Sequence, residues 1–207
     1  MPYRLSDGSI FLHNPRCGGT FADAVFRRLA VRGDGIGEKH DCPGVVPLDM
    51  TVPHRVFVRH PYHWIKSVWA WEAGNGWPAY PKYEQRWWHP FAEITPVPDE
   101  AKTFEAFLYW IANEHTGFVT STFMKFANWY NSDVYDTDCM DRHLPILLEK
   151  IGVDAERAAK AIAETIAAKK PRNDFPLPED ASPQARAVFY HAEATIFKRF
   201  GYAQEKT

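Results

Sequence analysis

The residues most suited to binding chemistry form the segment Pro15-Arg16-Cys17-Gly18-Gly19-Thr20, which lies between an apolar run at 9–14 and a helical pattern at 21–30. Backbone N–H groups at such a strand-to-helix turn point toward one spot, and the helix dipole adds positive charge there. Two glycines let a phosphate approach closely. The spacing is neither that of an ATP- or GTP-binding P-loop nor that of a dinucleotide loop. The segment therefore predicts an anion site, and a tight turn that needs glycines only for packing is the alternative.

A second basic residue follows a second predicted strand. The segment HRVFVRHPYHWIKSVW contains the β-branched run 55–58, then Arg59, and then Pro61 placed to open a helix that carries Ser67. An arginine at the end of a strand offers a bidentate guanidinium to an anion. His60 and His63 flank the proline, and we favour packing or solvent exposure over ligand binding for both.

His40, in the segment KHDCPGVVP, is a candidate general base, since a histidine with a pKa near 6.5 can accept a proton at physiological pH. Taken alone it would more simply be a surface or capping residue. Its neighbour Asp41 could suggest a metal-dependent hydrolase, but a single His-Asp pair lacks the further ligands that a metal needs. We therefore expect no metal.

These segments together resemble the sulfotransferase superfamily, in particular its compact bacterial and phage members. Its 5′-phosphosulfate loop reads approximately P-K-[ST]-G-[GT]-[TS], its second motif is a strand-end Arg with a Ser in the next helix, and a His in a K-[TS]-H-x-P-like segment lies between them. The resemblance implies 3′-phosphoadenosine-5′-phosphosulfate (PAPS) as donor, with 3′-phosphoadenosine-5′-phosphate (PAP) as product, and it assigns His40 as the base. It implies that the donor is bound by Arg16, Cys17, Gly18, Gly19, Thr20, Phe21, Arg59 and Ser67.

Arg16 stands where that family usually has Lys. Lysine is a mobile point charge that can follow the leaving oxygen, whereas arginine is a rigid fork that stays charged. We expect Arg16 to retain a catalytic role by stabilising charge during in-line transfer to an acceptor hydroxyl. The alternatives are a non-catalytic nucleotide- or anion-binding module that kept the pocket and, less favoured, a nucleotide-dependent kinase, for which no Walker lysine or magnesium carboxylates are found.

The surrounding elements predict an α/β protein. We expect a P-loop-like, three-layer fold with a central parallel sheet flanked by helices and a helix-rich C-terminal half, in one domain spanning 1–207. Helical patterns cover 103–115, about 118–130, 141–151, 155–168 from a cap at Asp154, and a last helix from Ser182 and Pro183 to Gly201. In the resembling family a late basic loop helps to hold the 3′-phosphate, so Lys170 and Arg172 are secondary candidates, although basic residues also favour a helix end by themselves.

An aromatic, proline-broken loop at about 75–98 is the least expected feature. Its aromatic residues and those just before it predict either a satellite core or a platform for an acceptor, because aromatic faces stack on sugars and flat rings. We favour the core for about half of them and keep Trp87 and Trp88 as acceptor contacts, with Tyr83, Glu84 and Arg86 nearby. A small-molecule or glycan acceptor is expected, with carbohydrate slightly preferred.

Composition limits the other classes. The formal net charge of -2 gives no general field for nucleic acid, so nucleic acid is not an expected partner. Three cysteines without C-x-x-C spacing argue against a disulfide framework and fit a reducing compartment. The N-terminal residues lack an unbroken apolar stretch, and no run reaches membrane-spanning length, so we expect a cytoplasmic protein without a membrane partner. The sequence does not indicate an oligomeric state.

Overall fold

The computed structural model describes residues 2–77, 90–127, 131–168 and 175–204. The chain forms two compact units, each built from two stretches of sequence. The first unit comprises Met1–Arg59 and Met124–Arg172, and the second comprises His60–Phe123 and Asn173–Thr207.

The first unit is built on a five-stranded sheet with the order β3-β1-β2-β4-β5. Its strands are β1 (Tyr3–Leu5), β2 (Ile10–Leu12), β3 (Arg32–Gly35), β4 (His54–Val58) and β5 (Ser132–Asp136). Strands β2, β4 and β5 run parallel, with Leu12 opposite Val56 and Val58 opposite Asp136. Both β2 and β4 are buried along their whole length, as strands covered on both faces must be.

The α/β class and the helix-rich C-terminal half are confirmed, and the sheet differs from the expected one in being mixed. β1 pairs antiparallel with both β2 and β3. β3 reads Arg-Gly-Asp-Gly and is largely exposed at the edge of the sheet, so it pairs through its backbone and carries no apolar pattern. Hydrophobic periodicity could therefore not predict it.

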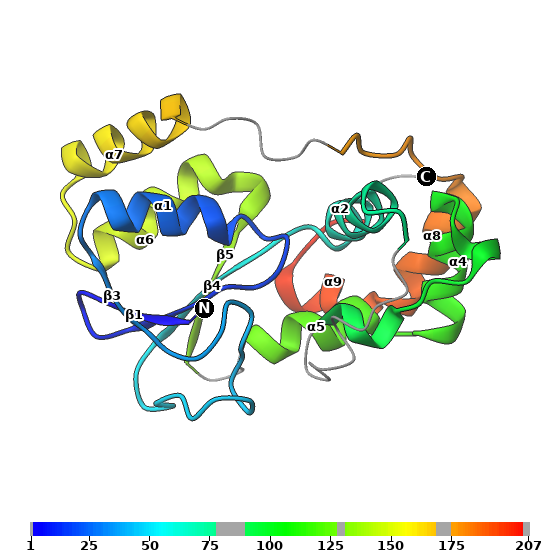
Figure 1. The fold of residues 1–207 in the computed structure, drawn as a ribbon, viewed down its shortest axis with the longest axis horizontal. Helices are drawn as coiled ribbons and strands as arrows, with labels where there is room; N and C mark the ends of the chain where they lie inside the picture. Colours follow the sequence, from blue (N-terminus) through cyan, green and yellow to red (C-terminus); the bar gives the residue numbers. More distant parts are fainter. Residues whose placement is uncertain (1, 78–89, 128–130, 169–174, 205–207) are drawn as a thin grey trace. The chain divides into compact units, whose positions relative to one another are not determined.

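The helices of the first unit are α1 (Gly19–Arg28), the 3₁₀ helix η3 (Thr137–Cys139), α6 (Met140–Lys150) and α7 (Ala155–Ala168). α1, α6 and α7 lie side by side (Figure 1). α1 buries Ala22, Val25 and Phe26, which are completely covered. The predicted cap of α7 is confirmed, because Asp154 Oδ1 accepts a hydrogen bond from the Arg157 N–H at 2.9 Å.

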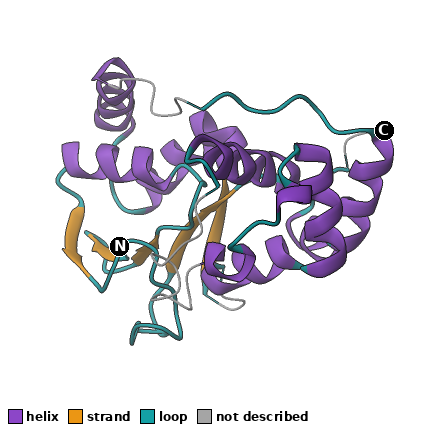
Figure 2. Cartoon of the chain, turned by 45° about the vertical axis from the view of Figure 1, so that its right-hand side comes forward, coloured by secondary structure: helices purple, strands orange, loops and turns teal. Residues whose placement is uncertain are grey.

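The second unit is helical. Its elements are α2 (Pro61–Gly74), the 3₁₀ helices η1 (Pro90–Ile94) and η2 (Asp99–Ala101), α4 (Phe104–Glu114), most of α5 (Phe118–Phe126), α8 (Pro183–Ala192) and α9 (Ala194–Phe200). Figure 2 shows that this part of the chain contains helices and loops in the residues described. Its core is aromatic: Trp64 is fully buried and contacts the rings of Phe91, Phe118 and Phe123.

The prediction of a single helix between Ser182 and Gly201 is wrong. The chain forms two helices there, α8 and α9, which are separated at Glu193. Ser182 caps α8 and Gly201 ends α9 with a φ of 68°, as predicted. Between them the buried Glu193 carboxylate accepts hydrogen bonds from the N–H groups of Val119 and Thr120 at 2.9 Å each. A carboxylate bound at the N-terminus of α5 is stabilised by the helix dipole, and this contact accompanies the break in the last helix.

The aromatic residues around the proline-broken loop pack into the core of the second unit where they are described. The Trp69 ring contacts Trp77, the Trp77 ring contacts Phe107, and the Trp71 ring contacts Phe91. The satellite core expected for about half of the aromatic residues is confirmed for these. The residues kept as acceptor contacts and as secondary phosphate contacts lie outside the described residues; they are Tyr83, Glu84, Arg86, Trp87, Trp88, Lys170 and Arg172.

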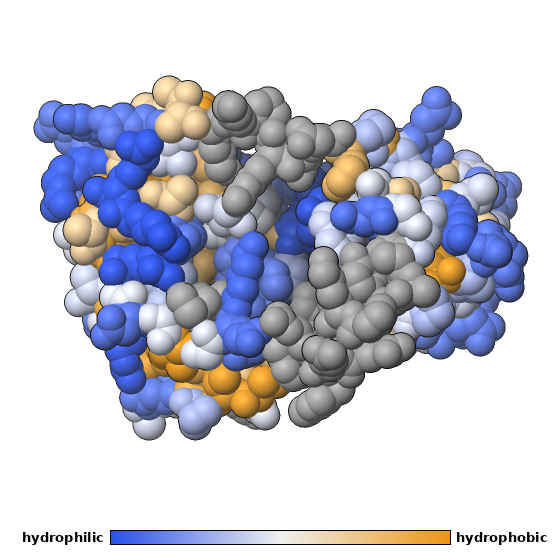
Figure 3. Space-filling model, viewed as in Figure 1, coloured by the Kyte–Doolittle hydropathy of each residue, from blue (hydrophilic) through white to orange (hydrophobic). Residues whose placement is uncertain are grey.

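The surface of the first unit is mostly hydrophilic, with an apolar patch over the segment that leads into β4, where Met50 is exposed (Figure 3). Within the four described stretches of the chain, no helix combines the length and the apolar character needed to cross a membrane.

Candidate functional site

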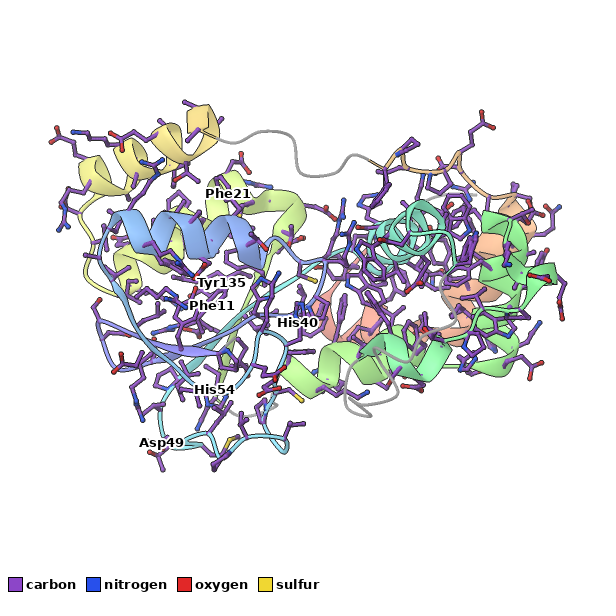
Figure 4. The ribbon with its side chains drawn as sticks, viewed as in Figure 1. Phe11, Phe21, His40, Asp49, His54 and Tyr135 are labelled. Carbon is purple, nitrogen blue, oxygen red and sulfur yellow. The ribbon has the colours of Figure 1, made fainter. Side chains whose placement is uncertain are left out.

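The three parallel strands of the first unit end at the same edge of the sheet, and the residues that follow them carry the polar groups of the candidate site. β2 is followed by His13, β4 by Arg59, and β5 by Thr137 and Asp138. Carboxyl ends of parallel strands are the usual place for ligands in open α/β sheets. In Figure 4, His40 and Phe21 lie toward the end of the unit where α1 begins, whereas His54 and Asp49 lie at the opposite end of the sheet.

The predicted anion loop connects β2 to α1 as the sequence indicated. Gly18 precedes the helix with a φ of 70°, a left-handed conformation that favours glycine. The N–H groups of Gly18, Gly19 and Thr20 stand at the start of α1, where a helix offers no acceptor one turn back. These N–H groups can therefore donate hydrogen bonds to an anion at the positive end of the helix dipole.

Cys17 contributes its backbone to this loop. Its carbonyl oxygen accepts a hydrogen bond from Thr137 Oγ1 at 3.0 Å, which ties the loop to the end of β5. The side chain is buried, and burial raises the pKa of the thiol well above its ordinary value, so the thiol stays protonated. A protonated, buried thiol is a poor nucleophile, so the backbone of Cys17 is the part proposed to face the donor.

Both glycines have close neighbours, although at Gly18 the neighbour is the flexible end of a methionine side chain and the left-handed φ is what requires glycine. A Cβ atom on Gly18 would lie 2.5 Å from Met140 Cε, and a Cβ atom on Gly19 would lie 2.5 Å from Cδ2 of His13. These separations are shorter than real carbon contacts allow. Gly19 therefore does more than permit phosphate approach, because it makes room for the imidazole ring of His13 against the first turn of α1.

Two arginines give the loop its positive charge. Burial lowers the pKa of Arg16, and the nearby positive charge of Arg59 lowers it further. Arg59 Nε forms an ion pair with Asp138 Oδ1 at 3.2 Å. Arg16 also has a φ of 60°, which is uncommon for a residue with a side chain and is found where surrounding structure enforces it. Two positive charges therefore lie near each other, next to the N–H groups at the start of α1. This arrangement suits a ligand with several negative charges.

His13 connects His40 to the anion loop. The Nδ1 atoms of the two rings are 3.2 Å apart, and His40 Nδ1 is 3.0 Å from the carbonyl oxygen of His13. His13 Nε2 in turn lies 3.4 Å from Thr20 Oγ1 on the first turn of α1. Burial, followed by the charge of His40, lowers the pKa of His13 to about 2, so this ring is neutral. A candidate base, a neutral second imidazole and the anion loop are thus connected.

The structure places the predicted residues Arg16 to Phe21, His40 and Arg59 within the first unit, at the end where α1 begins. Ser67 lies on α2 in the second unit with its side chain buried, and its role toward the donor stays a prediction. His60 packs as expected: its Nε2 is 3.0 Å from the Ala203 carbonyl oxygen, and its ring contacts Phe197.

The metal alternative gains no support. Asp41 caps a local turn by accepting a hydrogen bond from the Glu38 N–H at 2.6 Å. Among the residues that the structure describes, no group of three or more His, Cys, Asp or Glu side chains could hold a metal ion.

Three residues at the site were missed from the sequence, namely His13, Thr137 and Asp138. His13 could have been noticed because it follows an apolar strand directly and lies two residues before the loop. Thr137 and Asp138 gave no such signal, since β5 (Ser-Asp-Val-Tyr-Asp) is too polar to be predicted as a buried strand.

No protein-family model matches this sequence, and no curated protein matches it. The structure does match a solved one. It is similar to the crystal structure of mouse sulfotransferase SULT7A1 complexed with PAP. The two chains are 13% identical with a TM-score of 0.53, over 97% of this chain and 90% of that chain. The chain therefore has the fold of a sulfotransferase.

Proposed function

We propose that this protein is a sulfotransferase that moves a sulfuryl group from PAPS to an acceptor hydroxyl. The fold shared with a PAP-bound sulfotransferase supports this proposal. The observation that carries it is the pair Arg16 and Arg59, which follow the adjacent parallel strands β2 and β4 and act on each other as like charges. A site that brings two half-buried arginines together is matched to a ligand with several negative charges.

Each part of the donor has residues of suitable chemistry. Arg16 and the N–H groups at the start of α1 would hold the 5′-phosphosulfate, with Thr20 supplying a hydroxyl. Arg59 would bind the 3′-phosphate. Ser67, the second residue of the same sequence motif, is proposed as a further contact to this phosphate. When bound, PAPS supplies an activated sulfuryl group and a phosphate that can leave.

His40 would serve as the general base. It would take the proton of the acceptor hydroxyl as that oxygen forms its bond to sulfur, and the electron pair of the broken bond would remain on the departing phosphate oxygen. Arg16 would stabilise the charge that develops there, an interaction that grows stronger in the transition state. Since the positive groups come from the protein, the proposed reaction needs no metal.

The acceptor is proposed to be a small molecule or glycan, with carbohydrate preferred. Among the aromatic residues that motivated this preference, Trp69, Trp71 and Trp77 belong to the core of the second unit. The preference therefore depends on Trp87 and Trp88. It is tested by comparing sugar, phenol and peptide acceptors under the same conditions.

The experiment measures transfer of labelled sulfate from PAPS, together with calorimetric PAP binding. His40→Ala should bind PAP within a few-fold of the parent and lose about 10²- to 10⁴-fold in turnover, because a general base is removed while the phosphate contacts remain. Arg16→Ala should lose both binding and turnover. His191→Ala, which changes an exposed histidine on α8, is the matched control and should behave as the parent. Full turnover in His40→Ala would remove His40 as the base.

A non-catalytic binding module is the second candidate, and the arginine at position 16 favours it. Arg16 cannot follow the leaving oxygen as a mobile lysine would. This candidate predicts PAP binding by the parent without transfer to any acceptor. Gain of transfer in Arg16→Lys, where the parent has none, would show that the arginine is what disables the reaction.

A further inference from the structure

The imidazole of His13 lies between the candidate base and the anion loop. Its Nδ1 faces His40 Nδ1 at 3.2 Å, and its Nε2 faces Thr20 Oγ1 at 3.4 Å. The ring edge rests against Gly19, where a Cβ atom would lie 2.7 Å from Nε2. His13 is 6% exposed, so the surrounding atoms fix its position.

These contacts favour one assignment of hydrogens to the ring nitrogens. A carbonyl oxygen only accepts, so His40 Nδ1, 3.0 Å from the His13 carbonyl, must donate its N–H. The facing Nδ1 of His13 then has to be an acceptor, because two N–H groups cannot share a 3.2 Å contact. A neutral imidazole has one N–H group, so the hydrogen of His13 is on Nε2 and points to Thr20 Oγ1.

Two consequences follow from this arrangement. The lone pair of a neutral His40 is on Nε2, which is the nitrogen that can take a proton. The Thr20 hydroxyl accepts from His13 and therefore directs its own hydrogen to a different acceptor. A His13 that stays neutral keeps this pattern, since a protonated ring would donate at both nitrogens and oppose the N–H of His40.

We propose that His13 is a positioning residue that holds His40 in the tautomer with hydrogen on Nδ1 and turns the hydroxyl hydrogen of Thr20 toward the 5′-phosphate group of the donor. The part that concerns the donor rests on the proposed function. The part that concerns the tautomer is a property of the protein alone. The two histidines and Thr20 then form one hydrogen-bonded chain from the base to the anion loop.

Two substitutions separate the two halves of this chain. In His13→Asn the shorter amide lies near the position of Nδ1, so it keeps an acceptor for His40 and loses the donor to Thr20. In His13→Gln the longer amide reaches the position of Nε2, so it keeps the donor to Thr20 and loses the acceptor for His40. His13→Ala removes both, and thermal melting of each variant reports whether the fold persists.

The tautomer is measured by ¹⁵N NMR of the imidazole nitrogens in the full chain without any ligand. We expect His40 with hydrogen on Nδ1 and His13 with hydrogen on Nε2 in the parent and, for His40, in His13→Asn. In His13→Ala and His13→Gln, His40 should show both tautomers. Hydrogen on Nε2 of His40 in the parent, or an unchanged single tautomer in folded His13→Ala, would overturn the proposal.

PAP affinity then tests the half that involves Thr20. Thr20→Val and His13→Asn should each weaken PAP binding by about tenfold, as loss of a hydrogen bond to a charged group does, while His13→Gln stays within a few-fold of the parent. Combining His13→Asn with Thr20→Val should add little, because both remove the same contact. Full additivity would overturn the coupling. If PAP does not bind the parent at all, the proposed function fails, whereas the NMR result still decides the tautomer.

Discussion

Substituting Asp138→Asn should make the protein bind PAP more tightly, because Asp138 competes with the ligand for Arg59. Arg59 Nε and Asp138 Oδ1 are 3.2 Å apart, and the two side chains are 22% and 28% exposed. Partial exposure places this ion pair near the upper end of what surface pairs contribute, about 1 kcal/mol. Since 1.4 kcal/mol corresponds to tenfold, release of this pair should improve PAP affinity by about fivefold.

The assay is calorimetric titration of PAP into the parent and the variant at two salt concentrations. The gain should shrink at high salt, because partly exposed charges are screened. Asp141→Asn removes an exposed carboxylate from the first turn of the neighbouring α6 and is the matched control, expected to change affinity little. Unchanged or weaker binding in Asp138→Asn would show that Asp138 does not compete with the ligand. It would also refute the proposal that Arg59 must leave Asp138 to bind the 3′-phosphate.

Three further changes have defined outcomes. Arg16→Gly should be more stable to urea than Arg16→Ala by about 1 kcal/mol, because glycine removes the cost of the left-handed φ, while both lose PAP affinity; an alanine variant of equal stability would contradict this. Burial raises the pKa of Glu72 from 4.5 to about 7, so the unfolded chain loses this proton first and stability falls from pH 4.5 to pH 7. The free energy of unfolding of Glu72→Gln should therefore exceed that of the parent by on the order of 3 kcal/mol above pH 7 and equal it below pH 4.5. The exposed control Glu114→Gln should follow the parent at every pH. Parallel stability curves for Glu72→Gln and the parent would refute the reasoning. Gly19→Ala should destabilise the fold by about 1 to 3 kcal/mol and shift the ring resonances of His13, and unchanged melting and spectra would argue against the close packing.

The parts of the fold that the sequence predicted are those with strong local signals. β2 is a continuous apolar run, β4 ends in the apolar run Val56–Val58, and α2 and α8 begin at prolines in their first turns. The strands β1, β3 and β5 are short, polar or both, and they form because neighbouring strands offer backbone partners. Such pairing is a tertiary effect that no local pattern contains.

The residues of the candidate site also divide into those that local sequence predicts and those that only tertiary contacts bring together. The loop at 15–20 and Arg59 could be predicted, because their chemistry depends on a turn or a strand end that the local sequence indicates. Asp138 matters only because the parallel pairing of β4 with β5 brings it to Arg59. His13 matters only because the segment that carries His40 returns to the end of β2. Both roles depend on contacts between residues 27 or more positions apart in the chain.

The proposed function predicts a large difference between PAP and 5′-AMP binding to the parent protein, measured by calorimetry under the same conditions. The two ligands differ only in the 3′-phosphate, the group that Arg59 is proposed to bind. A charge-assisted contact of this kind contributes about 1.5 to 3 kcal/mol, so PAP should bind roughly 10- to 100-fold more tightly than 5′-AMP. Equal affinities for the two nucleotides, or no binding of either, would contradict the proposal that this chain uses PAPS as a sulfuryl donor.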